Sequence, residues 1–309
     1  MDPKHIETVR TFNRAVTLRL GVLSDRFLGS GRPLSQARVL YDIGSRGAQV
    51  RDLRSRLCLE SRYLSRLLRS LERQGLAKRC RTKDGARGMT VSLTSKGMHE
   101  LKELDRLSDQ FASLLLQRLP QNQQEILVQA MSAVERLMQA AAVKVAVVSP
   151  RCTAARWCLG EYFQELARRF TSGFDPARSI PADPKELTPP AGYFLLASLD
   201  GGAVGCGALK VKTGGIGEIK RMWVSPSARG MGIAQRILSA LEACARDAGV
   251  DVLRLETNET LKEAQSLYRR SGYQEVPAFN EEPYAHRWFE KMVSPPRSSI
   301  NSQKRISRE

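Results

Sequence analysis

The stretch from residue 218 to residue 249 constrains this chain most, because strand, turn and helix patterns follow one another within it. Ile219 and residues 222–224 form a β-prone run that Pro226 ends. A helix then opens from a glycine turn at residues 229–234, with apolar residues three or four positions apart. Unpaired N–H groups at a helix start, beside glycines that let backbone approach a ligand, bind anions without a charged side chain. The stretch predicts a phosphate-binding turn.

Spacing separates this turn from two familiar phosphate loops. The dinucleotide fingerprint G-x-G-x-x-G fails at Gln235, and no Gly-Lys-Ser/Thr of a Walker loop follows. What remains is R-x-x-G-x-A at residues 229–234, with Glu218 upstream and L-Y-x-x-x-G-Y at residues 267–273. Together these resemble the acetyl-CoA-binding motif of the GNAT N-acetyltransferases. A plain tight connection between strand and helix is the alternative.

The GNAT resemblance implies acetyl-CoA as co-substrate and acetyl transfer to an amine by direct attack on the thioester. It makes Glu218 a candidate general base and Tyr268 a candidate general acid. The residues alone also allow an ion pair of Glu218 with Lys220 or Arg221, and a plain core role for Tyr268. Backbone amides of the turn would hold the diphosphate, and the main chain of residues 222–224 would pair with the pantetheine arm. The implied cofactor-binding residues are Met222, Trp223, Val224, Arg229, Gly230, Met231, Gly232, Ile233, Ala234 and Asn258.

Charge is unevenly distributed along the chain. Residues 1–150 hold 26 Lys and Arg against 14 Asp and Glu, whereas residues 151–309 hold 23 against 18. The basic N-terminal half favours a polyanionic partner, above all nucleic acid, although a solvated basic surface is the alternative. The six cysteines form no C-x-x-C pair and the three histidines are far apart, so we expect no metal site. Without an apolar signal core or membrane-length run, we expect a cytoplasmic protein.

A helix predicted from about Ser61 to Gln74 has an arginine face. At about 100° per residue, Arg66 lies about 40° and Arg69 about −20° from Arg62. The leucines at residues 64, 67, 68 and 71 fall on the opposite face, which anchors the helix in a core. Ser61, also the candidate N-cap, and Ser65 edge the arginine side. This arrangement suits a recognition helix in the DNA major groove, and a solvated basic face is the alternative.

A basic hairpin follows this helix. Residues 76–81 and 89–94 are predicted strands, and Asp84-Gly85 between them is a turn signal. Arg81 lies on the approach to the tip, which carries Lys83 and Arg87. A basic hairpin after a helix-turn-helix is typical of a wing that contacts DNA. With the leucines of residues 53–64, the helix exit at residues 71–76 and L-T-S-K-G at residues 93–97, residues 1–142 resemble a MarR-type regulator.

These observations predict a multidomain protein. Residues 1–142 form a mainly α winged helix-turn-helix domain with dimerisation helices, and residues 143–293 an α/β GNAT fold with a central, mostly antiparallel sheet. Residues 294–309 are predicted to be a disordered basic tail. The MarR resemblance also implies a homodimer on double-stranded DNA with a palindromic operator.

Three functions are compatible with the sequence. The first is a bifunctional protein, a transcriptional regulator and an active acetyl-CoA-dependent N-acetyltransferase. In the second, the GNAT domain is a non-catalytic sensor of acetyl-CoA or an amine. The third is an acetyltransferase whose basic half contacts other proteins.

Overall fold

The chain divides into two compact units. The computed structural model describes residues 2–19, 27–81, 88–171 and 173–293. The units are Met1–Ser132 and Ala133–Glu309, and the division lies inside helix α6 (Gln121–Ala142). The sequence predicts a boundary at the end of the same helix, after residue 142, and this boundary stays a prediction. The predicted tail, residues 294–309, lies outside the described residues.

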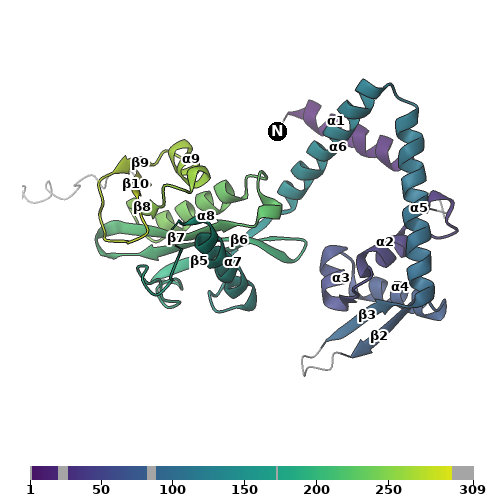
Figure 1. Cartoon of the computed structure of the whole chain (residues 1–309), viewed down its shortest axis with the longest axis horizontal. Helices are drawn as coiled ribbons and strands as arrows, with labels where there is room; N and C mark the ends of the chain where they lie inside the picture. The colour runs from purple at the N-terminus through teal and green to yellow at the C-terminus, as the bar shows by residue number, and fades with distance from the viewer. Residues whose placement is uncertain (1, 20–26, 82–87, 172, 294–309) are drawn as a thin grey trace, which may run out of the picture. The chain divides into compact units, whose positions relative to one another are not determined.

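The first unit combines helices with a small sheet (Figure 1). Strand β3 lies between β1 and β2 and pairs antiparallel with both. Leucines of α2 and α4 share a core with Leu53, Val91 and Leu104. The elements before α6 are α1 (Pro3–Arg19), η1 (Phe27–Gly29), α2 (Leu34–Ile43), β1 (Ala48–Gln49), α3 (Val50–Arg56), α4 (Ser61–Arg73), β2 (Ala77–Arg81), β3 (Met89–Leu93) and α5 (Ser95–Gln117).

Helix α4 follows the predicted pattern, with one correction. Its four leucines, at residues 64, 67, 68 and 71, are buried. The N-cap is Glu60 and not the predicted Ser61, because the Glu60 carbonyl already accepts the Leu64 N–H at 3.0 Å. Gly75 ends the helix as predicted, with a positive φ of 71° that a glycine adopts without strain.

The second unit is a seven-stranded sheet in the order β4-β5-β6-β7-β8-β10-β9, with helices on both faces (Figure 1). All neighbours are antiparallel except β7 and β8, as predicted for an α/β fold with a mostly antiparallel sheet. The elements are β4 (Lys144–Val147), α7 (Thr153–Arg169), β5 (Gly192–Leu199), β6 (Gly202–Val211), η2 (Thr213–Gly215), β7 (Ile216–Val224), η3 (Pro226–Ala228), α8 (Ile233–Asp247), β8 (Val252–Thr257), α9 (Lys262–Arg270), β9 (Gln274–Val276) and β10 (Arg287–Met292).

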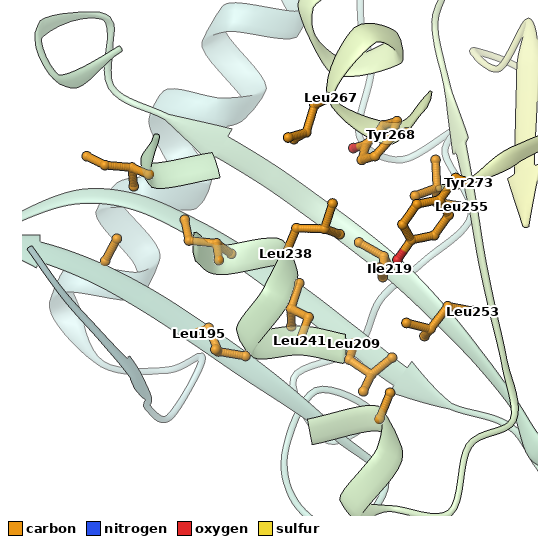
Figure 2. Packing of buried hydrophobic residues seen from close by; sticks show 14 of the residues in the cluster. Leu195, Leu209, Ile219, Leu238, Leu241, Leu253, Leu255, Leu267, Tyr268 and Tyr273 are labelled. Atoms are coloured by element: carbon orange, nitrogen blue, oxygen red, sulfur yellow. The ribbon is translucent and has the colours of Figure 1, made fainter. Parts of the chain in front are cut away.

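Side chains alternate between the two faces of the sheet along each strand, so each face carries apolar residues that a helix covers. Leu195 and Leu209 pack with Leu238 and Leu241 of α8, in the cluster of Figure 2. Their neighbours Phe194 and Ala208 point to the other face and pack with α7. The sheet therefore carries one apolar layer on each side.

Strands β7 and β8 separate, and this separation positions the site. They pair in parallel only from Ile216↔Val252 to Glu218↔Arg254. Beyond these pairs β7 runs on to Val224 and β8 to Thr257, and the described residues show no further pairing between them. The backbone groups of β7 on that side are consequently available to a ligand.

Candidate active site and DNA-contacting surface

The glycine turn before α8 presents its amides outward. Gly230 and Gly232 have φ of 80° and 71°, and a Cβ built on either would meet nothing within 4 Å. Gly232 is the N-cap of α8, and no side chain caps the helix. Within the described part of the chain, the amides of residues 230–234 donate to no protein acceptor. Amides at the positive end of a helix dipole suit an anion such as a diphosphate.

These amides border a cleft of about 500 Å³. The turn and the free end of β7 both line it, and their contact with a cofactor stays a prediction. Asn258 does not line this cleft but a neighbouring one, and Met231 instead packs against the core around α8. The predicted residues that line the cleft are Met222, Trp223, Val224, Arg229, Gly230, Gly232, Ile233 and Ala234.

Glu165 of α7 ties the turn to the sheet. It accepts hydrogen bonds from Trp223 Nε1 at 2.9 Å and from Arg229 at 2.5 and 2.7 Å. Arg229 Nε also donates to the Val224 carbonyl at 3.2 Å. Burial opposes ionisation of Glu165, but the hydrogen bonds from Arg229 and Trp223 hold its pKa below the usual value. The motif arginine is therefore held by an acid 64 positions away, which no local pattern indicates.

A second, smaller cleft of about 90 Å³ adjoins the first. Tyr162 and Tyr268 line both clefts, so they lie where the two meet. Burial raises the pKa of Tyr162 to about 12, although Arg221 opposes the shift. Burial, with Tyr162 and Glu256, also raises the pKa of Tyr268 well above its usual value. Both phenols are consequently protonated at neutral pH, which a proton donor requires.

Glu218 does not line either of these clefts. Its carboxylate lies 3.8 Å from Lys220 Nζ and 3.9 Å from Lys212 Nζ. Two other carboxylates, Glu256 of β8 and Glu282, line the smaller cleft, and Glu256 forms a buried ion pair with Lys220. The catalytic role of Glu218 stays a prediction, and Glu256 is a candidate that sequence reasoning missed.

Asn258 organises the loop after β8. Its Nδ2 donates to the Tyr284 carbonyl at 2.8 Å, and its Oδ1 accepts from the N–H and hydroxyl of Thr260 at 3.0 and 2.9 Å. It lines the smaller cleft. Its predicted contact with the cofactor is untested.

On α4, the predicted arginine face is exposed. Arg62, Arg66 and Arg69 are exposed, whereas the leucines opposite are buried. The Arg66 guanidinium lies 5.0 Å from the Tyr63 ring centroid, and Arg69 Nε donates to the Ser65 carbonyl at 3.3 Å. These contacts hold two guanidinium groups along the helix. Three cations on one exposed stripe form a surface complementary to phosphates.

Beside α4, the hairpin is attached by an ion pair. Arg79 of β2 donates to Glu72 of α4 at 2.8 and 2.5 Å. Arg81 ends β2, and nothing is described of its side chain. Lys83 and Arg87, with the predicted Asp84-Gly85 turn, lie outside the described residues.

The described residues hold neither a metal-binding cluster nor a membrane-spanning helix. In residues 2–19, 27–81, 88–171 and 173–293, no three His, Cys, Asp or Glu side chains are grouped to hold a metal ion. None of the described helices combines the length and apolar character needed to cross a bilayer.

Comparison with known proteins identifies the two units. Residues 159–273 match the acetyltransferase (GNAT) family, and residues 34–97 match a winged helix DNA-binding domain. The IAA acetyltransferase of Azospirillum brasilense is 43% identical over 125 residues, which are 40% of this chain and 80% of that protein. The chain belongs to the GNAT family of acetyltransferases, and its first unit carries a winged helix DNA-binding domain. The predictions of a GNAT acyltransferase and of a winged helix domain are confirmed.

Two solved structures have similar parts. An acyl-CoA N-acyltransferase from Klebsiella pneumoniae is 30% identical, with a TM-score of 0.41 over 50% of this chain and 99% of that one. A mutant MarR from Escherichia coli is 20% identical, with a TM-score of 0.37 over 40% of this chain and 93% of that one. Both TM-scores are below 0.5, so the family assignment rests on the sequence matches. Acetyl-CoA is the co-substrate of the GNAT family, and the open amides beside the free end of β7 fit it.

Proposed function

We propose that this protein is a DNA-binding transcriptional regulator and an N-acetyltransferase that transfers acetyl from acetyl-CoA to an amine. The observation that carries the enzymatic half is the row of unpartnered amides at residues 230–234, beside a cleft that meets a second cleft at Tyr268. One cleft suits the cofactor and the other suits the acceptor. The junction is where an amine would meet the thioester.

Transfer to an amine requires a group that removes its proton and another that protonates the departing thiolate. Tyr268 supports the second role, because it is protonated at neutral pH and borders both clefts. For the first role the family resemblance proposes Glu218, whereas Glu256 lines the acceptor cleft. Both carboxylates lie beside Lys220. We assign the larger part of the proton removal to Glu256 and the smaller part to Glu218, because Glu256 borders the space that the amine would occupy.

The exposed arginines of α4 support binding of double-stranded DNA through the winged helix. Exposed apolar side chains on α1 support the proposed homodimer: Ile6, Val9 and Phe12 lie on a helix with no buried residue. A second copy covering them would also present two recognition helices to a palindromic operator. A DNA partner and acetyl-CoA are both consistent with a cytoplasmic location.

The enzymatic half is tested by following free thiol release from acetyl-CoA with a panel of amines. Tyr268→Phe should lower kcat by about 10²-fold and leave acetyl-CoA affinity unchanged, since it removes only the donated proton. Because its pKa is raised, wild-type activity should show no loss from this group below about pH 10. If acetyl-CoA binds but no amine causes release of the CoA thiol, the enzymatic proposal is contradicted and the non-catalytic sensor is supported.

Two further variants distinguish the carboxylates. We expect Glu256→Gln to lower kcat/KM by at least about tenfold, and Glu218→Gln by less. A larger loss in Glu218→Gln would return the base role to Glu218. Melting temperatures of both variants separate a chemical loss from a folding defect, since each substitution disturbs an interaction with Lys220.

A further inference from the structure

Arg221 of β7 has an unusual backbone conformation in the smaller cleft. Its φ is 59°, a left-handed value that strains a residue other than glycine. The β6–β7 register shifts at this point, because Cys206 pairs with Trp223 while Ala208 pairs with Lys220. Such bulges redirect side chains near functional sites. Here two consecutive cations, Lys220 and Arg221, line the same cleft.

The two cations differ in their partners. Lys220 is neutralised by Glu256 and lies 3.8 Å from Glu218. Arg221 has no carboxylate within ion-pair distance among the residues that the structure describes. Its guanidinium carbon lies 5.0 Å from the Phe163 ring centroid and 5.8 Å from that of Tyr162. Arg221 is thus held in place by aromatic rings, and no acid of the described residues forms an ion pair with it.

Glu282, the other acid that lines this cleft, already has hydrogen-bond partners within the protein. Glu282 accepts hydrogen bonds from the Ser179 hydroxyl at 3.0 Å and the Ile180 N–H at 2.7 Å. It therefore fastens Ser179 and Ile180, which also line the cleft. A half-buried guanidinium without an anion is costly, and its planar donors match a carboxylate in two parallel hydrogen bonds.

We propose that Arg221 selects the acceptor by binding an anionic group that the amine carries, so that the substrate is a small amino acid or similar anionic amine. This inference rests on the proposed acetyltransferase function. The amine would lie toward Glu256 and Tyr268, and the anionic group toward Arg221, all of which line one cleft. A volume of about 90 Å³ is below the usual range of ligand pockets, which favours a small acceptor.

Binding of matched pairs tests this proposal without requiring turnover. The full chain, saturated with CoA, is titrated calorimetrically with glycine and methylamine, L-alanine and ethylamine, and L-phenylalanine and 2-phenylethylamine. Each pair differs in one carboxylate. We expect at least one acid to bind about tenfold or more tightly than its amine, since a charge-assisted hydrogen bond is worth that much. Arg221→Gln should reduce this preference to about twofold or less.

Matched variants distinguish the effect of the Arg221 charge from an effect on the folded structure. Arg254→Gln is the control, because Arg254 also lies over a ring, that of Phe279 at 5.4 Å, and pairs with Glu290 at 2.7 Å outside the cleft. It should keep the preference. Arg221→Lys, which retains the charge but not the planar fork, should keep part of it. The melting temperature of each variant checks the fold.

The outcomes are distinct. If no acid binds more tightly than its amine, or if folded Arg221→Gln keeps the full preference, the proposal is wrong. A preference for the acids that depends on Arg221 would support the anion site. If, in addition, no member of any pair causes acetyl-CoA to release its thiol, the proposed acetyltransferase function is contradicted. If the acids and the amines cause CoA thiol release equally well, the acetyltransferase function is supported and the anion site is contradicted.

Discussion

The two units contain different kinds of proposed phosphate-binding site. On α4, Arg62, Arg66 and Arg69 form an exposed stripe of side-chain charge. Before α8, the device is backbone: amides of residues 230–234 point outward from a turn with two positive φ angles. The first depends on which residues are present, and the second on the conformation that the chain adopts there. The difference suits their ligands, because a long duplex is held by many loose ion pairs and a single diphosphate by a few fixed dipoles.

Salt should separate the two devices most strongly. If each DNA site neutralises about six to ten phosphates, affinity falls on the order of 10³-fold or more between 50 and 200 mM salt. Acetyl-CoA affinity should fall by less than about tenfold, since fixed amides release few counterions. Titrations of the same preparation with labelled DNA and with acetyl-CoA measure both. If the DNA affinity and the acetyl-CoA affinity depended equally on salt, the proposed difference between side-chain and backbone binding would be contradicted.

Removal of two charges from the arginine stripe should have the next largest effect. Arg62→Ala with Arg66→Ala should weaken DNA binding by about 30-fold or more and reduce the salt slope by about two. The control is Arg38→Ala with Arg106→Ala, which removes the same charge from arginines paired with Asp42 and Glu103. Equal losses in both double variants would mean that net charge, and not the α4 stripe, drives binding.

A methyl group in the glycine turn tests the backbone device. Gly232→Ala strains a position at φ 71° by about 1–2 kcal/mol, so acetyl-CoA affinity should fall by about tenfold. Gly249→Ala introduces comparable strain, at φ 72°, beyond the other end of α8. It should lower the melting temperature similarly but leave acetyl-CoA affinity unchanged. DNA affinity should respond to neither.

The smallest effect concerns the arginine that anchors the hairpin. The hydrogen bond from Arg79 lowers the pKa of Glu72 below its usual 4.5. The stabilisation is therefore complete above about pH 4.5 and is lost as pH falls through the lowered value. Glu72→Gln should remove this pH dependence and cost about 0.5 kcal/mol at neutral pH, measured by urea unfolding. A larger cost would indicate that the pair does more than attach the hairpin.

Elements with a strong period were predictable from the sequence. The α4 leucines are buried opposite the exposed arginines, as the helical period predicted. Strands β2 and β3 pair across the predicted hairpin, from Ala77↔Leu93 to Arg81↔Met89. The turn before α8 also formed where glycine spacing placed it. In the helices the pattern repeats every three or four residues and in the strands every two, so a short stretch of sequence is enough to predict each element.

Site residues held by distant partners were not predictable. Glu165 reaches Arg229 across 64 positions, and Glu256 reaches Lys220 across 36. Nothing in the α7 or β8 patterns distinguishes these acids from ordinary surface or strand residues. Glu218 belongs to the motif on β7, whereas Glu256 lies outside the motif on the neighbouring strand β8.

By itself, the sequence determined the family, the order of the elements, the arginine stripe and the phosphate turn, because these depend on local spacing and on glycines that tolerate positive φ. Only the tertiary structure decided which carboxylates line the smaller cleft, what holds Arg229, and that Arg221 has no acid partner among the described residues. The reason is physical. Separation of β7 from β8 and the bulge opposite Gly207 arise from strand pairing across the whole sheet, which no short segment encodes.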